Sequence, residues 1–383
     1  MDPKDYVSAY GDIEFVKGKG EETYPSFIPK GLPPGITFDA SLALALSRAD
    51  AKLGKLSGAG LLLLNPNLLI TPYLKKEAIL SSKIEGTRIS LSDLLLNEAK
   101  GGEKDVPDAL EVGNYVEAVS FALKEIEQRP IDLDLIREMH RRLMKGVRGG
   151  DKSPGEFRNI QNWIGPEKST KEEATFIPPY PAKVEELMNG LIGYINSSDD
   201  TPPLIKCSLI HYQFETIHPF RDGNGRIGRA LITLYLCKNK LMIKPLLYLS
   251  GFFEENRDEY AGLLLKTNKE GIFEPWIKYF LKGVETQSAD ALERTIKLQE
   301  LRENYRKTLQ KKHNTTKLLD LIDRLFENPY ITITQAKERL QVSFPTAKRL
   351  IETLNSYGIT REISTEYKSR IYVAEEIRRA IDL

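Results

Sequence analysis

One stretch decides the fold of this chain, and it reads His218-Pro219-Phe220-Arg221-Asp222-Gly223-Asn224-Gly225-Arg226-Ile227-Gly228-Arg229. Residues 202–217 before it begin with two prolines and carry apolar residues on every helical face, which predicts a buried helix. Pro219 prevents that helix from continuing, and the glycines on either side of Asn224 allow backbone angles that other residues avoid. Apolar residues recur at helical spacing after Arg226. The stretch therefore predicts a helix, a glycine loop and a second buried helix.

The residue types in this loop suit a bound phosphate. The amides of residues 223–225 would lie at the N-terminus of the second helix, where unpaired N–H groups and the helix dipole favour anions. Arg226 and Arg229 share a helical face, from which they can grip phosphate oxygens. Asp222 offers a hard oxygen ligand for Mg²⁺. His218, with an unperturbed pKa near ~6.5, can take a proton from an attacking hydroxyl.

Three other interpretations of the stretch remain, and we favour none of them. Residues 223–228 match the dinucleotide pattern G-x-G-x-x-G, but that motif requires a preceding strand and an acidic residue further on, and a helix is predicted here instead. The second interpretation makes His211 and His218 metal ligands, but no further ligands appear nearby and Pro219 interrupts the helix. A loop that only caps a helix is the third, because glycines and histidines are common at helix ends.

The stretch resembles the motif of Fic-domain proteins, His-Pro-Phe-x-[Asp/Glu]-Gly-Asn-Gly-Arg-x-x-Arg, at every fixed position. The resemblance implies a protein adenylyltransferase, which moves AMP from ATP to a Ser, Thr or Tyr hydroxyl of a target protein and releases pyrophosphate. By position, it implies that His218 is the general base and that Asp222 binds Mg²⁺. The residues that it assigns to the nucleotide phosphates are Gly223, Asn224, Gly225, Arg226 and Arg229.

A second motif lies upstream, at Ser81-Ser82-Lys83-Ile84-Glu85-Gly86. Ser81 and Glu85 are four residues apart and so share a helical face, and Gly86 can end the helix. Alone, these residues would be an ordinary helix terminus. They also resemble the inhibitory motif [Ser/Thr]-x-x-x-Glu-[Gly/Asn] of Fic proteins, whose glutamate pairs with the second arginine of the first motif, here Arg229. The resemblance implies that Glu85 takes this arginine from the γ-phosphate and silences transfer by misplacing the α-phosphate.

The helical pattern is broken between Gly149 and Pro181, where two short β-prone runs flank a polar tip and predict a β-hairpin. In Fic proteins a hairpin flap beside the active site holds the target segment by strand addition. The resemblance therefore assigns the flap, and binding of the target, to Thr175, Phe176 and Ile177.

One further nucleotide-binding residue follows from the resemblance. Asn268 matches an asparagine that Fic proteins place near the adenine, downstream of an aromatic pair. Here Tyr260 is followed by Ala261, so the second aromatic of the family pattern is missing. The choice of base is accordingly left open.

Composition bounds the remaining possibilities. The chain has 383 residues and a formal net charge of +1, which argues against a general affinity for nucleic acid. Its two cysteines lie on helices predicted to be buried, so no disulfide framework is expected. Neither a membrane span nor a signal peptide is recognised in the sequence. We expect a cytoplasmic protein without a membrane partner.

The predicted fold class is all-α, with a Fic-type helical core, a small β-hairpin flap and a C-terminal winged helix-turn-helix domain. Residues 1–100 are expected to hold an extended arm and the helices with the inhibitory motif, and residues 101–285 the catalytic core. Residues 286–314 are predicted to form a helical connector. In residues 315–383, three short helices precede an alternating segment, 359–373, whose turn at 366–369 reads as the tip of a wing.

A winged helix suggests DNA binding, but fold alone does not establish function. Acidic residues in the domain nearly match the basic residues in number. The basic residues suited to phosphate contacts are Lys348, Arg349, Lys368 and Arg370. Docking of targets or of a second protomer is at least as well supported, and self-modification and a homodimer are compatible with the sequence. Two alternative functions remain: a de-AMPylating hydrolase in which Glu85 orients water, and a nucleotide-sensing DNA-binding transcriptional regulator.

Overall fold

The computed structural model describes residues 1–18, 23–62, 67–102, 106–166, 170–310, 316–363 and 370–382. The fold is predominantly helical, as the sequence predicts, and no helix among these residues is both long and apolar enough to cross a membrane. The helices are η1 (Pro3–Asp5), α1 (Ala40–Leu62), α2 (Asn67–Lys83), α3 (Leu91–Ala99), α4 (Pro107–Glu125), α5 (Leu133–Leu143), α6 (Pro181–Asn196), α7 (Pro203–Ile217), α8 (Asn224–Lys238), α9 (Ser250–Glu255), α10 (Arg257–Glu270), α11 (Glu274–Gln310), α12 (Thr316–Glu327), α13 (Ile333–Leu340), α14 (Phe344–Ser356) and α15 (Glu375–Asp382). The strands are β1 (Gly11–Lys17), β2 (Thr23–Pro29), β3 (Tyr330–Thr332), β4 (Arg361–Ile363) and β5 (Ile371–Val373).

The predicted pair of buried helices, α7 and α8, forms the centre of the molecule. Nearly all side chains of both helices are buried, and the two helices pack against each other. His218 ends α7 in a left-handed conformation, with φ 51° and ψ 60°, and Pro219 follows it. Gly223, with φ 74°, then precedes the first turn of α8. The helix, loop and helix expected from the sequence are confirmed.

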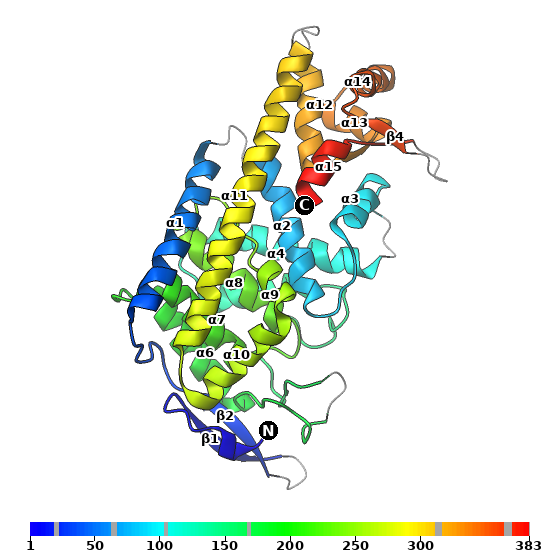
Figure 1. Cartoon of the computed structure of the whole chain (residues 1–383). Coiled ribbons are helices and arrows are strands. Elements are labelled where there is room, and N and C mark those ends of the chain that lie inside the picture. Colours follow the sequence, from blue (N-terminus) through cyan, green and yellow to red (C-terminus); the bar gives the residue numbers. More distant parts are fainter. Residues whose placement is uncertain are drawn as a thin grey trace.

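A single long helix, α11, runs from this core to the C-terminal elements, with α1 packed along it (Figure 1). The sequence predicts that the catalytic core ends at residue 285 and that a helical connector begins at residue 286, but α11 continues across this point without a break. No proline occurs between residues 276 and 310, and the one glycine, Gly283, is not enough to stop a helix. A side chain at Gly283 would meet Phe252 at 2.7 Å, so this glycine allows close packing against α9. The boundary proposed between core and connector lies inside α11.

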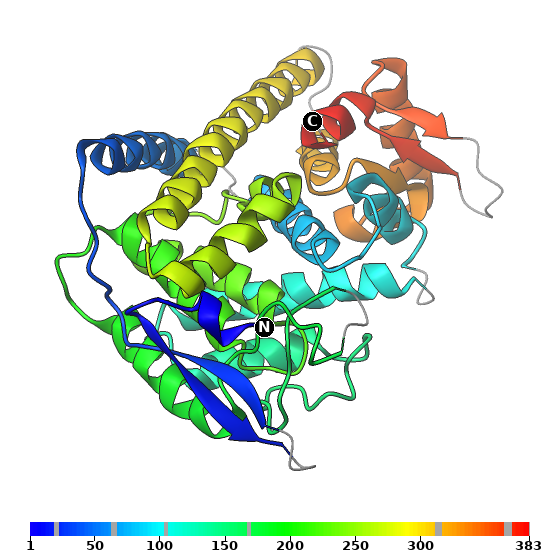
Figure 2. The ribbon, with the colours of Figure 1, turned by 60° about the horizontal axis from the view of Figure 1, so that its bottom comes forward.

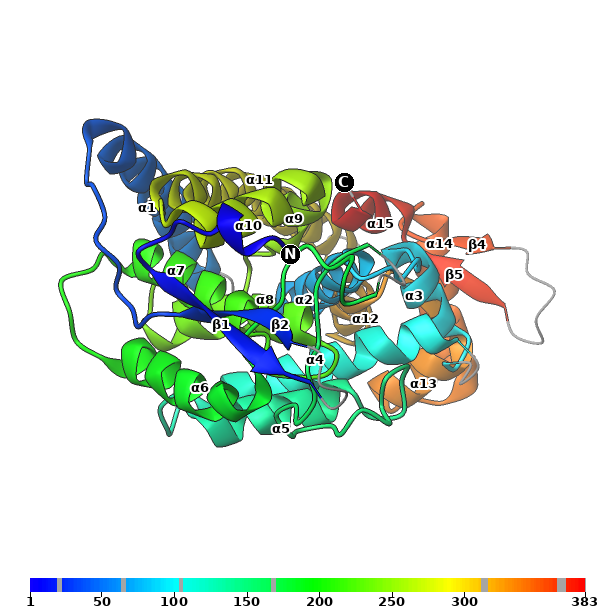
Figure 3. The ribbon, with the colours of Figure 1, turned by 90° about the horizontal axis from the view of Figure 1, so that it is seen from below.

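The N-terminal arm, expected to be extended, contains an antiparallel hairpin. Strands β1 and β2 pair from Gly11 with Pro29 to Lys17 with Thr23. The hairpin lies on the outside of the core next to α7 (Figures 2 and 3). Phe27 is fully buried, and its ring lies 5.8 Å from that of Phe176. This packing joins residues distant in sequence, so the hairpin could not be predicted from local turn residues.

The C-terminal residues, for which a winged helix-turn-helix is predicted, form short helices and a small sheet. The three predicted helices are α12, α13 and α14, and an antiparallel sheet of order β3-β5-β4 accompanies them; β3 and α15 were not predicted. The amide of Asn328 donates to the Leu95 carbonyl at 2.9 Å, and that of Gln335 to the Glu98 carbonyl at 3.1 Å. These bonds attach the C-terminal elements to α3.

The basic residues considered for DNA contact are partly paired with carboxylates. Lys348 lies 3.7 Å from Glu352, and Arg370 lies 3.4 Å from Glu362. The predicted wing tip, 366–369, which includes Lys368, lies outside the described residues. DNA binding by this region stays a prediction that is not favoured.

Trp276 ties α11 to α7 and should be important for stability. Its side chain is fully buried, and its indole nitrogen donates to the Ser208 carbonyl at 3.0 Å. We expect Trp276→Ala to lower the free energy of unfolding by about 3–5 kcal/mol, measured by urea denaturation followed by circular dichroism. The control is the chain's other tryptophan, Trp163, which is 41% exposed. An equally large loss in Trp163→Ala would contradict this account of Trp276.

Candidate functional site

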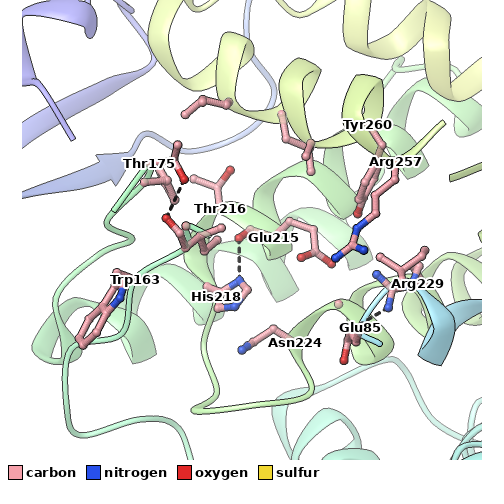
Figure 4. Close-up of a pocket in the computed structure, with 18 of the residues that line it drawn as sticks. Glu85, Trp163, Thr175, Glu215, Thr216, His218, Asn224, Arg229, Arg257 and Tyr260 are labelled. Carbon is pink, nitrogen blue, oxygen red and sulfur yellow. Dashed lines mark hydrogen bonds and ion pairs between the residues drawn. The ribbon is translucent and has the colours of Figure 1, made fainter. Parts of the chain in front are cut away.

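A cavity of about 720 Å³ opens where the glycine loop, α10, the end of α2 and the segment 163–176 meet (Figure 4). This volume is typical of a site for a small molecule. The predicted site residues that line it are Glu85, Thr175, Phe176, His218, Asp222, Gly223, Asn224, Gly225, Arg229 and Asn268. Ser81, Gly86, Ile177 and Arg226 are not part of its wall. The fold thus gathers residues from four separate segments of the chain around one cavity.

His218 is held in the form of a base. Its Nδ1 lies 3.2 Å from the carbonyl oxygen of Glu215 (Figure 4). A carbonyl only accepts, so Nδ1 carries the hydrogen and Nε2 keeps a lone pair. Burial and, after it, the positive charge of Arg158 lower the pKa of His218 to about 4. The imidazole is therefore neutral at pH 7.

Asp222 is ionised and tightly held. Its Oδ1 accepts from the Gly223 amide at 2.7 Å, and its Oδ2 accepts from Lys152 Nζ at 2.8 Å. Burial raises the pKa of Asp222, but Lys152, Arg226 and the Gly223 amide outweigh it, so the pKa lies below its ordinary value. The ionised Asp222 carboxylate on the cavity wall fits Mg²⁺, which takes most of its remaining ligands from phosphates and water. The described part of the chain contains no group of three or more His, Cys, Asp or Glu residues that could hold a metal ion by themselves.

The glycine loop is shaped by its own side chains. Asn224 Oδ1 accepts from the Phe220 amide at 2.7 Å, and Asn224 Nδ2 donates to the Phe220 carbonyl at 2.8 Å. The Asn224 side chain therefore holds the loop closed, and its backbone amide lies in the first turn of α8. A side chain at Gly225 would lie 2.6 Å from both Glu85 and Arg229. Glycine is required there because these two groups lie directly against the loop.

Glu85 pairs with both arginines of the motif. Its Oε1 lies 2.8 Å from Arg229 Nη2, as the sequence implied, and its Oε2 lies 2.9 Å from Arg226 Nε. Ser81 supports this arrangement because its hydroxyl and its carbonyl each accept from Arg229 at 2.8 Å. Gly86, with φ 102°, turns the chain after α2. The Glu85 carboxylate thus forms ion pairs with both arginines, whereas the sequence implied a pair with Arg229 alone.

The predicted flap is not a regular hairpin. Among the described residues of this segment, one antiparallel bridge joins Ile164 and Phe176. Pro178 and Pro179 follow at once, and because proline lacks an N–H they cannot extend a ladder. Phe176 and Ile177 are buried, and the Ile177 carbonyl accepts from the Phe27 amide at 3.0 Å. Of the three residues assigned to the flap, only Thr175 is exposed.

Asn268 lines the cavity from α10. Its Oδ1 accepts from the Tyr212 hydroxyl at 2.5 Å and from the Thr216 hydroxyl at 3.2 Å. Because both hydroxyls use the oxygen, the amide nitrogen is the group that Asn268 can offer to a ligand. Ala261, which replaces the second aromatic of the family pattern, lines the cavity.

His211 is a core residue. Its Nε2 lies 2.8 Å from the Tyr260 hydroxyl and its Nδ1 lies 3.1 Å from the Gly228 carbonyl. Since both nitrogens have partners, His211 and His218 do not form a metal pair. The dinucleotide reading also fails, because the helix α7 and not a strand precedes the glycine loop.

Sequence reasoning missed three residues of the site: Lys152, Arg158 and Glu215. Lys152 and Arg158 reach the motif from more than fifty residues away, and no local periodicity marks them. Glu215 points into the cavity (Figure 4), and burial raises the pKa of its carboxyl to about 7. Its position three residues before His218 is the only signal that the sequence offered.

Comparison with known proteins agrees with these motifs. A model of the Fic/DOC family matches residues 130–236, and a model of the Fic/DOC family N-terminal region matches residues 43–124. A probable protein adenylyltransferase of Aquifex aeolicus is 28% identical over 204 residues, which are 52% of this chain and 56% of that protein. Protein adenylyltransferase fic-1 of Caenorhabditis elegans is 30% identical over 174 residues, 44% of this chain and 30% of that protein. The match thus spans about half of the first relative and less than a third of the second.

Two solved structures share the fold. A Fic family protein from Desulfovibrio desulfuricans superimposes with a TM-score of 0.57 over 90% of this chain and 98% of that chain, at 19% identity. Fic-1 from Caenorhabditis elegans (residues 134–508) gives a TM-score of 0.51 over 68% of this chain and 74% of that chain, at 23% identity. At these identities the likeness supports the fold and not the activity.

Proposed function

Because the chain belongs to the Fic/DOC family, we propose that it is a protein adenylyltransferase, which moves AMP from ATP to a hydroxyl side chain of a target protein. The names of the relatives support this activity. The observation that carries the proposal is the placement of a neutral histidine, with its Nε2 lone pair available, in the same cavity as an anion-binding helix N-terminus.

The reaction is a displacement at the α-phosphorus. A Ser, Thr or Tyr hydroxyl of the target forms a new oxygen–phosphorus bond while the bond to the β-phosphate breaks, and pyrophosphate leaves. His218 Nε2 takes the hydroxyl proton. Backbone amides at the start of α8 stabilise the negative charge on the α-phosphate as the bonds change. Arg226 and Arg229 hold the β- and γ-phosphates once Glu85 no longer occupies them.

Asp222 is the residue that would hold Mg²⁺ with the phosphates. A bound ion would neutralise part of the phosphate charge and polarise the phosphoryl oxygens. Lys152 pairs with Asp222 Oδ2 at 2.8 Å and would compete with the ion for this oxygen. Asn268 and the apolar wall near Ala261 form the end of the cavity suited to the base.

The experiment that tests this function follows the phosphate label. Glu85→Gly protein is incubated with Mg²⁺ and ATP labelled at either the α- or the γ-phosphate, and self-modification gives a readout that needs no known target. We expect label on the protein from α-labelled ATP alone, and none in the Glu85→Gly, His218→Ala double variant. Label from γ-labelled ATP would show that the protein transfers a phosphoryl group and not AMP. Release of AMP from an already modified protein, lost in Glu85→Gly, would instead support the hydrolase.

The pH dependence of transfer should reflect the lowered pKa of His218. An ordinary histidine would lose its base form as the pH falls through ~6.5, whereas His218 stays neutral until about pH 4. We therefore expect kcat/KM, which reports the free enzyme, to show no acidic limb near pH 6.5. The measurement is kcat/KM for the Glu85→Gly protein between about pH 5 and pH 8, the range in which an ordinary histidine changes its charge. A tenfold decrease per pH unit below 6.5 would contradict the assigned environment of His218.

A further inference from the structure

Resting on the proposed function, we infer that Arg158 is a positioning residue for His218, which fixes the catalytic turn and keeps the imidazole in its base form. Arg158 is 3% exposed and lies on the segment between α5 and α6. It reaches across to residues sixty positions away. The contacts it makes there are with the backbone, so neither of the two sequence motifs contains it.

Arg158 binds three consecutive carbonyls at the end of α7, those of residues 217–219, which form the catalytic turn. Its Nη2 donates to the Ile217 carbonyl at 3.2 Å and its Nε to the His218 carbonyl at 2.8 Å. Its backbone amide donates to the Pro219 carbonyl at 2.9 Å. The last carbonyls of a helix have no partners within the helix, so one arginine supplies what the end of α7 lacks.

The same guanidinium fastens the flap segment to this turn. Arg158 Nη2 also donates to the Pro179 carbonyl, just after the flap residues. The Pro178 carbonyl accepts from Ser26 Oγ at 3.0 Å, so consecutive carbonyls here are fixed from two sides. His218 holds a left-handed conformation that a residue with a side chain rarely adopts, which costs free energy unless the surroundings enforce it. Arg158 enforces it and sets the distance between the base and the flap.

The charge of Arg158 has a second effect. A helix C-terminus carries partial negative charge, which favours a protonated histidine and would raise its pKa. The guanidinium at the same carbonyls opposes that effect, and after burial it is the next cause that lowers the pKa of His218. Within the described ranges no carboxylate pairs with Arg158, and this suits the task, since a nearby carboxylate would cancel the field of the guanidinium.

Other charged groups face His218, and the experiment holds them constant. Glu215 lies on the same helix, Glu85 follows α2, and Asp222 lies in the glycine loop; each raises the pKa of His218 or supports the Nδ1 hydrogen. Arg257, on α10, lines the same cavity. Both Arg158 variants below carry Glu85→Gly, and the other three groups are the same in each.

The test compares Arg158→Gln with Arg158→Lys, both in the Glu85→Gly protein. The side-chain titration of His218 is followed by NMR with labelled histidine, which is practical because the chain has four histidines and His218→Ala identifies the signal. In Arg158→Gln we expect the pKa of His218 to rise toward its ordinary value, and kcat to fall about tenfold or more with the Kd for ATP little changed. Arg158→Lys keeps the charge but not the fork of donors, so we expect a low His218 pKa with a reduced kcat.

A matched control separates this role from general stability. Arg302, on α11, binds both carboxylate oxygens of Asp323, at 2.7 and 2.9 Å, far from the cavity. Arg302→Gln should lower the melting temperature without changing the titration of His218 or kcat. An unchanged His218 titration in Arg158→Gln would overturn the inference, whatever happens to kcat. The titration does not require AMP transfer, so failure of the inference is distinguishable from failure of the proposed function. If Arg158→Gln does not fold, Arg158→Lys decides: an unchanged kcat would overturn the inference.

Discussion

Glu85→Gly protein should transfer AMP about 100-fold faster than the unmodified protein, because a misplacement of about one ångström at the reacting atoms costs roughly that factor. In the structure Glu85 pairs with Arg229 at 2.8 Å and with Arg226 at 2.9 Å. Both guanidinium groups are nearly fully buried, so the phosphates of ATP cannot reach them from another side. Removing one carboxylate frees both at once. The measurement is the rate of label transfer from α-labelled ATP, with affinity for ATP determined separately.

The double pairing leads to a more specific expectation than rate alone. If Glu85 blocked only the second arginine, its removal would chiefly realign the phosphates. Because it occupies Arg226 as well, we expect Glu85→Gly also to bind ATP more tightly. Glu85→Gln, which keeps the size and removes the charge, should share much of the gain.

The control for this prediction lies on the same turn. Lys83 pairs with Glu254 at 2.9 Å and touches neither arginine, so Lys83→Ala loosens the end of α2 without freeing them. Transfer by Lys83→Ala should stay at the unmodified level. Equal activation by Lys83→Ala and Glu85→Gly would show that mobility of α2, and not the Glu85 charge, controls the enzyme. No activation by Glu85→Gly would remove the inhibitory role.

The sequence was a good guide where chemistry is local. Pro219, Gly223 and the apolar faces on either side of them predict α7, the loop and α8, because each of these signals acts within a few residues. The pair formed by Glu85 and Arg229 followed from two motifs and not from any rule of local structure. Its second partner, Arg226, depends on how α2 sits against α8, which only packing decides.

The failures have the same origin. The flap was predicted as a hairpin from β-prone residues, but among its described residues the pairing stops at the bridge between Ile164 and Phe176, and Phe176 and Ile177 are buried against the N-terminal hairpin. Strand propensity is largely a measure of fit to a half-buried surface, so a burial site elsewhere in the fold satisfies the same residues. Arg158 escaped notice because its partners are backbone carbonyls, which every residue has and no sequence pattern marks.

His218→Ala should lower the rate of AMP transfer by about 10²–10⁴-fold, the range that a positioned general base contributes. No phosphate-binding group is lost in this variant, since the amides of the glycine loop and both arginines remain. We therefore expect the Kd for ATP to be little changed, which separates a chemical role from a binding role. The measurement is made in the Glu85→Gly protein, so that transfer before the second substitution is high enough to follow.

The backbone at this position dictates the better comparison. His218 is left-handed, and a change to alanine keeps that unfavourable conformation without the Nδ1 bond to Glu215 that accompanies it. His218→Asn is the sharper variant, because asparagine tolerates left-handed angles and cannot take a proton at neutral pH. If the asparagine variant is folded and binds ATP but transfers no AMP, the lost function is proton transfer. Normal transfer by either variant would overturn the assignment of His218 as the base, and Glu215, whose carboxyl lines the same cavity, would be the residue to examine next.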